Sequence, residues 1–322
     1  MTSLISAKVI AHSVASNSNK EIVTFELEYP RIIHSEIKTH RMLSGNSASS
    51  RAIPVKTLIE MVRNEPAMPY RFGANQPGMQ DKGEEHVGVV GAGYSGRDWW
   101  KLAALSAARF AEELADAGYH KQIANRLLEP FQRIKTVLTA TELANFWWLR
   151  LDKDADPTIK ELAEVMKESY DNSEKEVLKP GEWHTPYVLH SEGKDGEIGY
   201  YVLDESGEWP VDLSLEEALA ISSSCCAQVS YRRLNSTKDK ALDIYSRLLS
   251  GDKVHASPFE HQSTPMEFIN VDSDTEYGNP LVLFFEKALK GYTHVDSNGD
   301  FWSGNFKGFI QHRQLLDNHS VW

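Results

Sequence analysis

Alternation of apolar and polar positions opens the chain and predicts β-strands. Residues 7–29 alternate in this way, most clearly over 22–29, and Pro30 ends the run. A short helix is expected within 31–43, and a second helix over 55–63. The start of the chain therefore predicts strands followed by helices.

Helical patterns dominate the middle of the chain, after an irregular interval at 65–97 that is rich in Pro and Gly. Asp98 is predicted to cap a long helix over 99–117, which Gly118 ends. Further helices are expected at 121–128, at 133–151 and, with Pro157 in its first turn, at 157–170.

A polar interval at 171–212 is expected to be a linker or an insertion, since it is rich in Gly, Pro, Glu and Lys. Beyond it the pattern predicts helices at 215–224, 237–250 and 306–316, and strands at 227–231 and 281–285. We expect one domain over 1–322, with parts at 1–170, 171–212 and 213–322.

Composition limits the possible partners. The chain has 322 residues, a net charge of −12 and a hydrophobic fraction of 41%, which is typical of a soluble globular protein. A nucleic acid polymer is a poor partner for so acidic a chain, but a few arginines in a cleft still attract a small anion. No apolar run approaches the roughly 20 residues that span a bilayer, and the start lacks a secretory signal. We expect a cytoplasmic protein without membrane contact, whose adjacent Cys225 and Cys226 are buried thiols.

The segment with the most candidate chemistry is the polar run from Thr39 to Arg51. It holds two arginines, a histidine, four serines and an asparagine, with only three apolar side chains. A core segment of this kind would leave many polar groups without partners. Arginine binds phosphate and carboxylate bidentately, and serine and asparagine add hydrogen bonds. The run therefore predicts an anion-binding loop, most simply for a nucleotide.

This loop resembles the signature of the flavin-dependent thymidylate synthases. That family carries Arg-His-Arg, seven residues and then Ser, with an inner Ser-x-Asn and a closing Arg. Thr39 stands here in place of the first Arg. The residues that fall in register are His40, Arg41, Ser44, Asn46, Ser49 and Arg51.

A second block carries the resemblance further. The family has an Arg just before a Leu-Pro pair that reaches the nucleotide phosphate, and an Asn-Phe-x-x-Leu-Arg whose Arg holds the pyrimidine. Arg126, Asn145 and Arg150 fall on those positions, and Arg150 follows a cluster of three aromatic residues that suits a planar base. Thr139 and Thr141 stand where the family usually has an Asn and an Arg that help to bind flavin.

A third block lies at 227–231 and 255–261, which resemble the family's Ala-Arg-Val-Ser and His-x-Ser/Thr-Pro-Phe-Glu-His segments. Family members place the second segment before the Arg-His-Arg loop, so this chain looks circularly permuted. The spacing of its histidines does not suit a metal site, because Pro258 breaks any shared helical face. The resemblance gives cofactor or catalytic positions to Ser230, His255, Ser257 and Glu260.

The resemblance implies an α+β fold, with a mixed sheet and a helical bundle, in a homotetramer whose active sites lie at subunit interfaces. It implies a methyltransferase in which NADPH reduces bound FAD and a one-carbon unit passes from methylenetetrahydrofolate to C5 of dUMP, giving dTMP. Catalysis would fall to Arg150, Ser49 and His255, and substrate binding to Arg51, Ser49, Arg126 and Arg150. The implied cofactor-binding residues are His40, Arg41, Ser44, Asn46, Asn145, Ser230, Ser257 and Glu260.

Three alternatives stay open. A divergent relative could act on another pyrimidine deoxynucleotide such as dCMP, or release a hydroxymethyl product as in phage base modification. A non-catalytic nucleotide-binding relative would have kept only the fold. A Rossmann oxidoreductase is suggested in outline by the Gly-x-Gly-x-x-Gly run at 91–96, although the strand before it is short and no acidic residue ends a second strand. Gln311, His312 and Arg313 faintly resemble the signature loop and are expected at the end of a surface helix.

Overall fold

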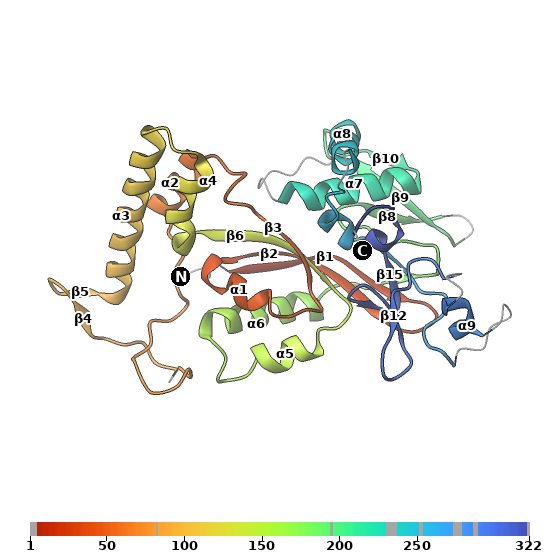
Figure 1. Cartoon of the computed structure of the whole chain (residues 1–322), viewed down its shortest axis with the longest axis horizontal. Coiled ribbons are helices and arrows are strands. Elements are labelled where there is room, and N and C mark those ends of the chain that lie inside the picture. The colour runs from red at the N-terminus through yellow and green to blue at the C-terminus, as the bar shows by residue number, and fades with distance from the viewer. Residues whose placement is uncertain are drawn as a thin grey trace.

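A five-stranded mixed sheet forms the centre of the protein (Figure 1). The computed structural model describes residues 5–81, 83–193, 196–229, 237–250, 254–272, 279–285 and 289–320. Four neighbouring strands are antiparallel, and the fifth, β7, runs parallel to β1 at the edge. In spatial order the strands are β3 (Ser44–Ser47), β6 (Arg133–Ala140), β2 (Glu21–Pro30), β1 (Ser6–Ala15) and β7 (Glu176–Leu178).

The strands predicted within 7–29 are confirmed as β1 and β2, which pair with a bulge between Val9 and Ala11. The helix predicted over 133–151 is wrong in its first half, because β6 occupies 133–140 between β2 and β3. Its β-branched residues suit a strand that is buried on both faces. Only α5 (Ala144–Arg150) is helical there.

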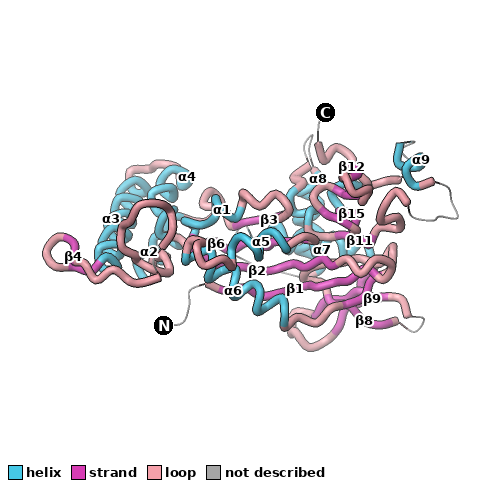
Figure 2. Tube along the Cα trace, turned by 90° about the horizontal axis from the view of Figure 1, so that it is seen from below, coloured by secondary structure: helices cyan, strands magenta, loops and turns pink. Residues whose placement is uncertain are grey.

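Two helices, α5 and α6 (Pro157–Asp171), cover one face of the sheet (Figures 1 and 2). Pro157 lies in the first turn of α6, as the sequence predicts, and the side chain of Asp156 accepts hydrogen bonds from the backbone N–H groups of Thr158 and Ile159. The apolar face of α6 packs into the main core through Ile159, Leu162 and Met166. This helix therefore covers the face of the sheet that points down in Figure 1.

A group of helices extends one end of the sheet. It consists of α2 (Val55–Asn64), α3 (Gly96–Asp116), α4 (Lys121–Ala124) and the 3-10 turn η2 (Asn125–Phe131). The cap of α3 is Ser95 and not Asp98, because the Ser95 side chain accepts from the Asp98 N–H. The glycine-rich run at 91–96 is an exposed hairpin of β4 (Val89–Val90) and β5 (Tyr94–Ser95), not the buried strand that a dinucleotide fold requires.

The interval 171–212 is ordered where it is described. It contributes β7 to the main sheet and forms a small antiparallel sheet of β8 (Leu189–Glu192), β9 (Ile198–Leu203) and β10 (Pro210–Leu213). Two helices, α7 (Leu215–Gln228) and α8 (Lys238–Leu249), follow and lie above the main sheet (Figure 1). The helices predicted in this part of the chain are confirmed.

Three predictions for the C-terminal part are wrong. The start of the strand predicted at 227–231 belongs to the end of α7, where small residues dominate and every residue from Ala220 to Gln228 is buried; residues 230–231 lie outside the described residues. The apolar run at 281–285 is helix α9 (Pro280–Phe285), since a short run of this kind fits either structure.

The helix predicted at 306–316 is instead two short strands and a turn, because Gly308 with φ 77° breaks it. These elements and their neighbours are η4 (Ser257–Glu260), β11 (Ser263–Pro265), β12 (His294–Val295), β13 (Phe301–Ser303), β14 (Phe306–Lys307), β15 (Phe309–Gln311) and η5 (His312–Leu315). The mixed sheet with its helical group confirms the α+β fold class. None of the described helices is long and apolar enough to cross a membrane.

Candidate functional site

The polar run 39–51 begins after the turn η1 (Arg31–Ile33) and helix α1 (His34–Ile37), forms strand β3 and then turns into α2. Alternation along β3 buries Ser44 and Asn46. The Asn46 amide donates to the Cys226 carbonyl of α7 over 2.8 Å and accepts from Ser257 Oγ over 3.2 Å. The first and third sequence blocks therefore meet, although 211 residues separate Asn46 from Ser257.

The carboxylate of Glu260 forms an ion pair with Arg313, and its carbonyl accepts from Gln311 Nε2 over 3.3 Å. Gln311 is buried and also donates to Ser44 Oγ over 3.4 Å. The prediction that Gln311 and Arg313 end a surface helix is therefore wrong. They hold Glu260 beside the signature loop, a role that their sequence does not indicate because it depends on contacts across the fold.

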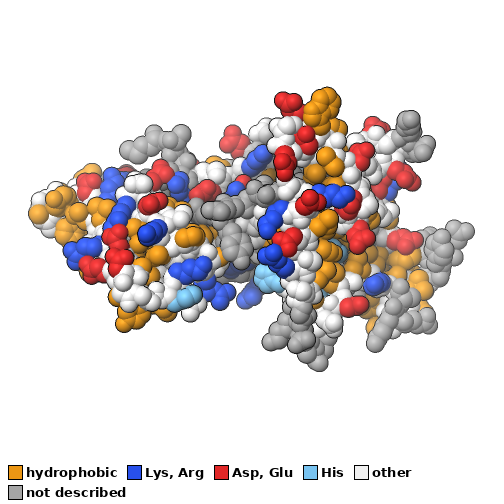
Figure 3. All heavy atoms as spheres, turned by 90° about the horizontal axis from the view of Figure 1, so that it is seen from above, with side chains coloured by type: hydrophobic (Ala, Val, Ile, Leu, Met, Phe, Trp, Pro, Cys, Tyr) orange, Lys and Arg blue, Asp and Glu red, His pale blue; other side chains and the backbone are white. Residues whose placement is uncertain are grey.

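A large cavity, about 1050 Å³, lies between the signature loop and α8. Three predicted site residues line it, namely Ser49, Arg51 and His255. Lys121, Lys240 and Arg247 line the cavity as well, and the sequence did not predict them as site residues. No acidic residue is among the described residues that line it. Figure 3 shows Lys, Arg and His side chains gathered at the middle of this face. On a chain with a net charge of −12, this concentration of cations favours an anionic ligand.

A second cavity of about 230 Å³ adjoins the first, because Ser49 and Arg51 line both. Arg31, His34 and Arg126 complete its basic lining. Burial, with smaller contributions from Lys38 and Arg31, lowers the pKa of His34 to about 4, so its imidazole is neutral near pH 7. Its Nδ1 hydrogen-bonds the hydroxyl of Tyr29 over 2.9 Å. The cavity has the size and the donors for a phosphate group.

Glu129 contacts three of the side chains that line this small cavity. Its carboxylate accepts from Arg31 Nη2 over 3.2 Å and from Ser50 Oγ over 2.8 Å, and lies 3.6 Å from Arg126 Nη1. The Arg126 side chain is 62% exposed, so its guanidinium keeps most of its donors for a ligand. Arg51 is exposed as well, and among the described contacts its guanidinium has no ion pair.

Arg150 belongs to a different cluster, which lines neither of these cavities. Its Nε donates to His40 Nε2 over 2.9 Å, and its Nη1 lies 3.3 Å from Glu36. Burial and the neighbouring Arg150 lower the pKa of His40, so the ring is a neutral acceptor. Asn145 and Arg41 are exposed nearby in sequence. One chain therefore assembles the predicted residues in three groups, namely the residues that line the cavities, the hydrogen-bonded set around Asn46 and Ser257, and the cluster of Arg150.

The unusual Thr139 is explained by a buried chain of hydroxyl and imidazole groups. Thr139 hydrogen-bonds His261 Nδ1 over 2.9 Å and Thr24 over 2.7 Å, and Thr24 in turn hydrogen-bonds His184 over 2.8 Å. Thr141 accepts from the backbone N–H of Lys307 over 3.0 Å. Both threonines thus fasten the C-terminal half of the chain to the sheet.

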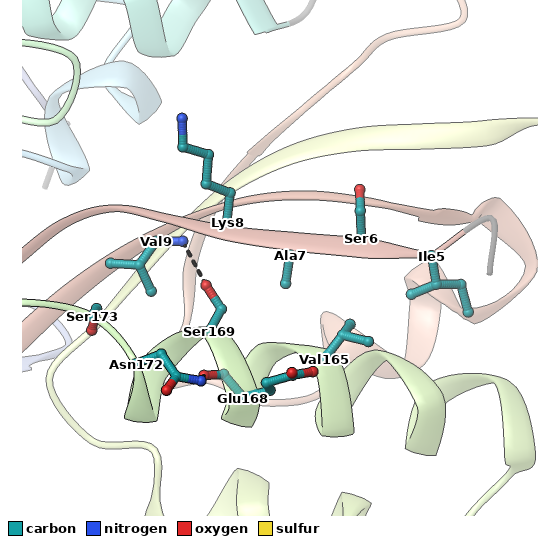
Figure 4. A pocket seen from close by; sticks show the side chains of 10 residues that line it. All are labelled: Ile5, Ser6, Ala7, Lys8, Val9, Val165, Glu168, Ser169, Asn172 and Ser173. Carbon is teal, nitrogen blue, oxygen red and sulfur yellow. Dashed lines mark hydrogen bonds between the residues drawn. The ribbon is translucent and has the colours of Figure 1, made fainter. Parts of the chain in front are cut away.

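A further hollow of about 490 Å³ lies between β1 and α6, on the side of the sheet opposite α7 (Figure 4). Ile5, Ala7 and Val9 point into it, and the Val9 N–H donates to Ser169 Oγ over 2.9 Å. It contains none of the predicted site residues. It is a packing seam between a strand and a helix.

The cysteines, possible metal ligands and Ser230 are the remaining candidates. Cys225 and Cys226 are buried and free, and burial raises the pKa of the Cys225 thiol to about 12, which suits inert core residues. No group of three or more His, Cys, Asp or Glu that could hold a metal ion occurs within the described ranges. The cofactor prediction for Ser230 lies outside the described residues.

The protein thus has an α+β fold and two adjoining cationic cavities. Ser49 and Arg51 of the signature loop line both cavities. Residues 3–172, more than half of the chain, match the family described as thymidylate synthase complementing protein. The chain belongs to this family, which confirms the resemblance drawn from the two motif blocks within residues 3–172.

Solved structures that match the chain include two of the UMP/dUMP methylase PolB from Streptomyces cacaoi. The structure bound with 5-Br dUMP is 16% identical, with a TM-score of 0.38, and covers 52% of this chain and 89% of its own. The structure bound with 5-Br UMP is 17% identical, with a TM-score of 0.37, and covers 52% of this chain and 88% of its own. The comparison with curated proteins found no match.

Proposed function

We propose that this protein transfers a one-carbon unit from methylenetetrahydrofolate to C5 of dUMP, giving dTMP, with FAD as the bound cofactor and NADPH as the reductant. Membership of the thymidylate synthase complementing protein family supports this reaction class. The observation that carries the proposal is the convergence of Ser49, Arg51 and Arg126 on the two adjoining cavities.

The small cavity would hold the phosphate of the pyrimidine nucleotide. Arg51 of the signature loop and Arg126 of η2 both line it, and Ser49 adds a hydroxyl donor. Because His34 is neutral near pH 7, it would contribute a hydrogen bond but no charge. The two arginines would then supply the positive charge that a phosphate requires.

The large cavity fits a dinucleotide such as FAD. Its volume of about 1050 Å³ exceeds the usual range of roughly 300–1,000 Å³ for small-molecule sites, and its lining mixes cations with the apolar Ile244 and Leu248. When bound, the flavin would supply hydride chemistry that no side chain provides. His255 lines this cavity and would lie near the cofactor.

The C-terminal part at 213–322 would supply the segment that family members carry before the signature loop. The hydrogen bonds of Asn46 with Ser257, and of Thr139 with His261, support this permuted arrangement, because they seat the segment against β3 and β6. Ser44, Asn46, Ser257 and Glu260 are not among the residues that line the large cavity, so they would act on the flavin site only through their protein partners.

Arg150 would bind the pyrimidine ring and stabilise negative charge on its oxygen. Since Arg150, His40, Arg41 and Asn145 do not line the cavities of their own chain, the proposal requires a homotetramer in which a neighbouring subunit supplies them. Mixing the variants Arg51→Ala and Arg150→Ala tests this requirement. Mixed oligomers should recover activity that neither variant has alone, whereas sites confined to one chain would leave the mixture inactive.

Product analysis tests the reaction itself. The purified protein is incubated with FAD, NADPH, methylenetetrahydrofolate and either dUMP or dCMP, and the nucleotides are identified by mass spectrometry. We expect dTMP from dUMP. A hydroxymethyl product, or reaction with dCMP alone, would replace the proposal with the related transfer reaction that Thr39 and Thr139 suggest. No product from either nucleotide would favour a non-catalytic nucleotide-binding relative.

A further inference from the structure

The wall of the large cavity that faces the signature loop is formed by α8. Lys240, Ile244, Arg247 and Leu248 all line the cavity. Their spacing of four, three and one residues places them on one face of the helix. Cations and aliphatic side chains therefore alternate along this wall.

Asp243 holds the two cations of α8 in place. Its Oδ2 lies 3.0 Å from Lys240 Nζ and 2.8 Å from Arg247 Nη2. One carboxylate thus pairs with two cations, which leaves a net positive charge on this helix face. Across the cavity, Lys121 and Arg51 add two further positive charges, and no acidic side chain faces them among the described lining residues.

The number of cations exceeds what a single phosphate requires. The small cavity already offers Arg51 and Arg126 to one phosphate group, while Arg31 is paired with Glu129. A ligand with two linked phosphates would use the additional charges of Lys121, Lys240 and Arg247, while its rings or sugars pack on Ile244 and Leu248. The volume of about 1050 Å³ leaves room for both parts.

We propose that α8 is a recognition helix for the diphosphate of a dinucleotide, with Lys240 and Arg247, assisted by Lys121, as its phosphate contacts. These residues lie outside the interval 3–172 that matches the family, except for Lys121. The identification of the dinucleotide as FAD or NADPH rests on the proposed function. The diphosphate site itself rests only on the geometry of the cavity.

Isothermal titration calorimetry of the full-length protein tests this inference, with FAD, NADPH, ADP and dUMP as separate probes. In the double variant K240Q/R247Q, we expect the affinity for ADP and for FAD or NADPH to fall about tenfold or more, because charge-assisted hydrogen bonds to phosphate are lost. The dinucleotide that loses affinity identifies the occupant. Affinity for dUMP should stay unchanged, since neither residue lines the small cavity.

Arg109→Gln is the matched control. Arg109 is 67% exposed and pairs with Glu113 four residues on, as Arg247 is 69% exposed and pairs with Asp243 four residues before it. The control should bind every probe as the wild type does. Circular dichroism confirms folding, and the single variant R247Q replaces the double variant if the latter does not fold.

Unchanged affinity for ADP, FAD and NADPH in the folded variant would overturn the inference, as would an equal loss in Arg109→Gln. Failure of the wild type to bind any of the three diphosphates would overturn it as well. If the wild type binds ADP but neither FAD nor NADPH, and the variant loses ADP, the diphosphate site stands and the proposed function fails.

Discussion

Acid should destabilise this protein in part through His261. The imidazole is fully buried, its Nδ1 hydrogen-bonds Thr139, and its Nε2 has no partner among the described residues. Burial, with a smaller contribution from Lys38, lowers its pKa from 6.5 to about 3. The folded state therefore keeps this ring neutral at pH values where the unfolded chain binds a proton.

The sign of the effect follows from proton linkage. Because the folded pKa lies below the unfolded one, the contribution to stability is complete above pH 6.5 and is lost as the pH falls from 6.5 towards 3. A pH of 5 lies about 1.5 units below the pKa of the unfolded ring. At roughly 1.4 kcal/mol per unit, the unfolding free energy is therefore lower by about 2 kcal/mol at this pH. His34 and His312, with pKa values lowered to about 4, act in the same direction.

Urea unfolding at pH 8 and pH 5, at one protein concentration, measures this contribution. In His261→Asn the loss of unfolding free energy between the two pH values should be about 2 kcal/mol smaller than in the wild type. The variant should also be less stable at pH 8, because Thr139 loses a buried partner. His86→Asn, which alters an exposed histidine, should keep the wild-type pH dependence. Equal pH dependence in His261→Asn and the wild type would refute the reasoning.

Four further outcomes are expected. Arg51→Ala should weaken binding of both dUMP and a dinucleotide by about tenfold or more in calorimetry, because Arg51 lines both cavities; weakening of only one would contradict a shared arginine. Arg150→Lys should lower kcat/KM for dUMP about tenfold or more, since lysine lacks the Nε–H that binds His40. Gly93→Ala should leave NADPH binding unchanged and lower the melting temperature slightly, because its φ of 85° lies in an exposed hairpin; lost nicotinamide binding would revive the Rossmann alternative. Asn46→Ala should cost about 1–3 kcal/mol in urea unfolding, since it removes two tertiary hydrogen bonds, and an unchanged midpoint would contradict their role.

The sequence predicts elements well where the pattern is long and its caps are local. The helix at 157–170 follows from Asp156, Pro157 and an apolar face, all of which act within a few residues. The segment 133–140 contains good helix formers as well as β-branched residues, and its strand form depends on neighbours more than 80 residues away. Pairing with β2 and β3 determines that this segment is a strand, and the local sequence carries no signal of that pairing.

The site shows the same division. The motif at 39–51 singles out Ser49 and Arg51 because their donors stand together in one loop, and the structure places both on the lining of the two cavities. Gln311 and Arg313 escaped prediction, since their contact with Glu260 spans some 50 residues. Lys240 and Arg247 carried a weak signal in their helical spacing, but their place opposite Arg51 becomes visible only when the chain folds.

The visible absorption spectrum of the purified protein with FAD, recorded without oxygen before and after NADPH is added, tests the central claim most directly. The account predicts a bound-flavin spectrum that bleaches with NADPH and bleaches faster when dUMP is present. A protein that takes up no FAD would contradict a flavin-dependent pyrimidine methyltransferase. A bound flavin that stays oxidised after NADPH is added, both with dUMP and with dCMP, would contradict it as well.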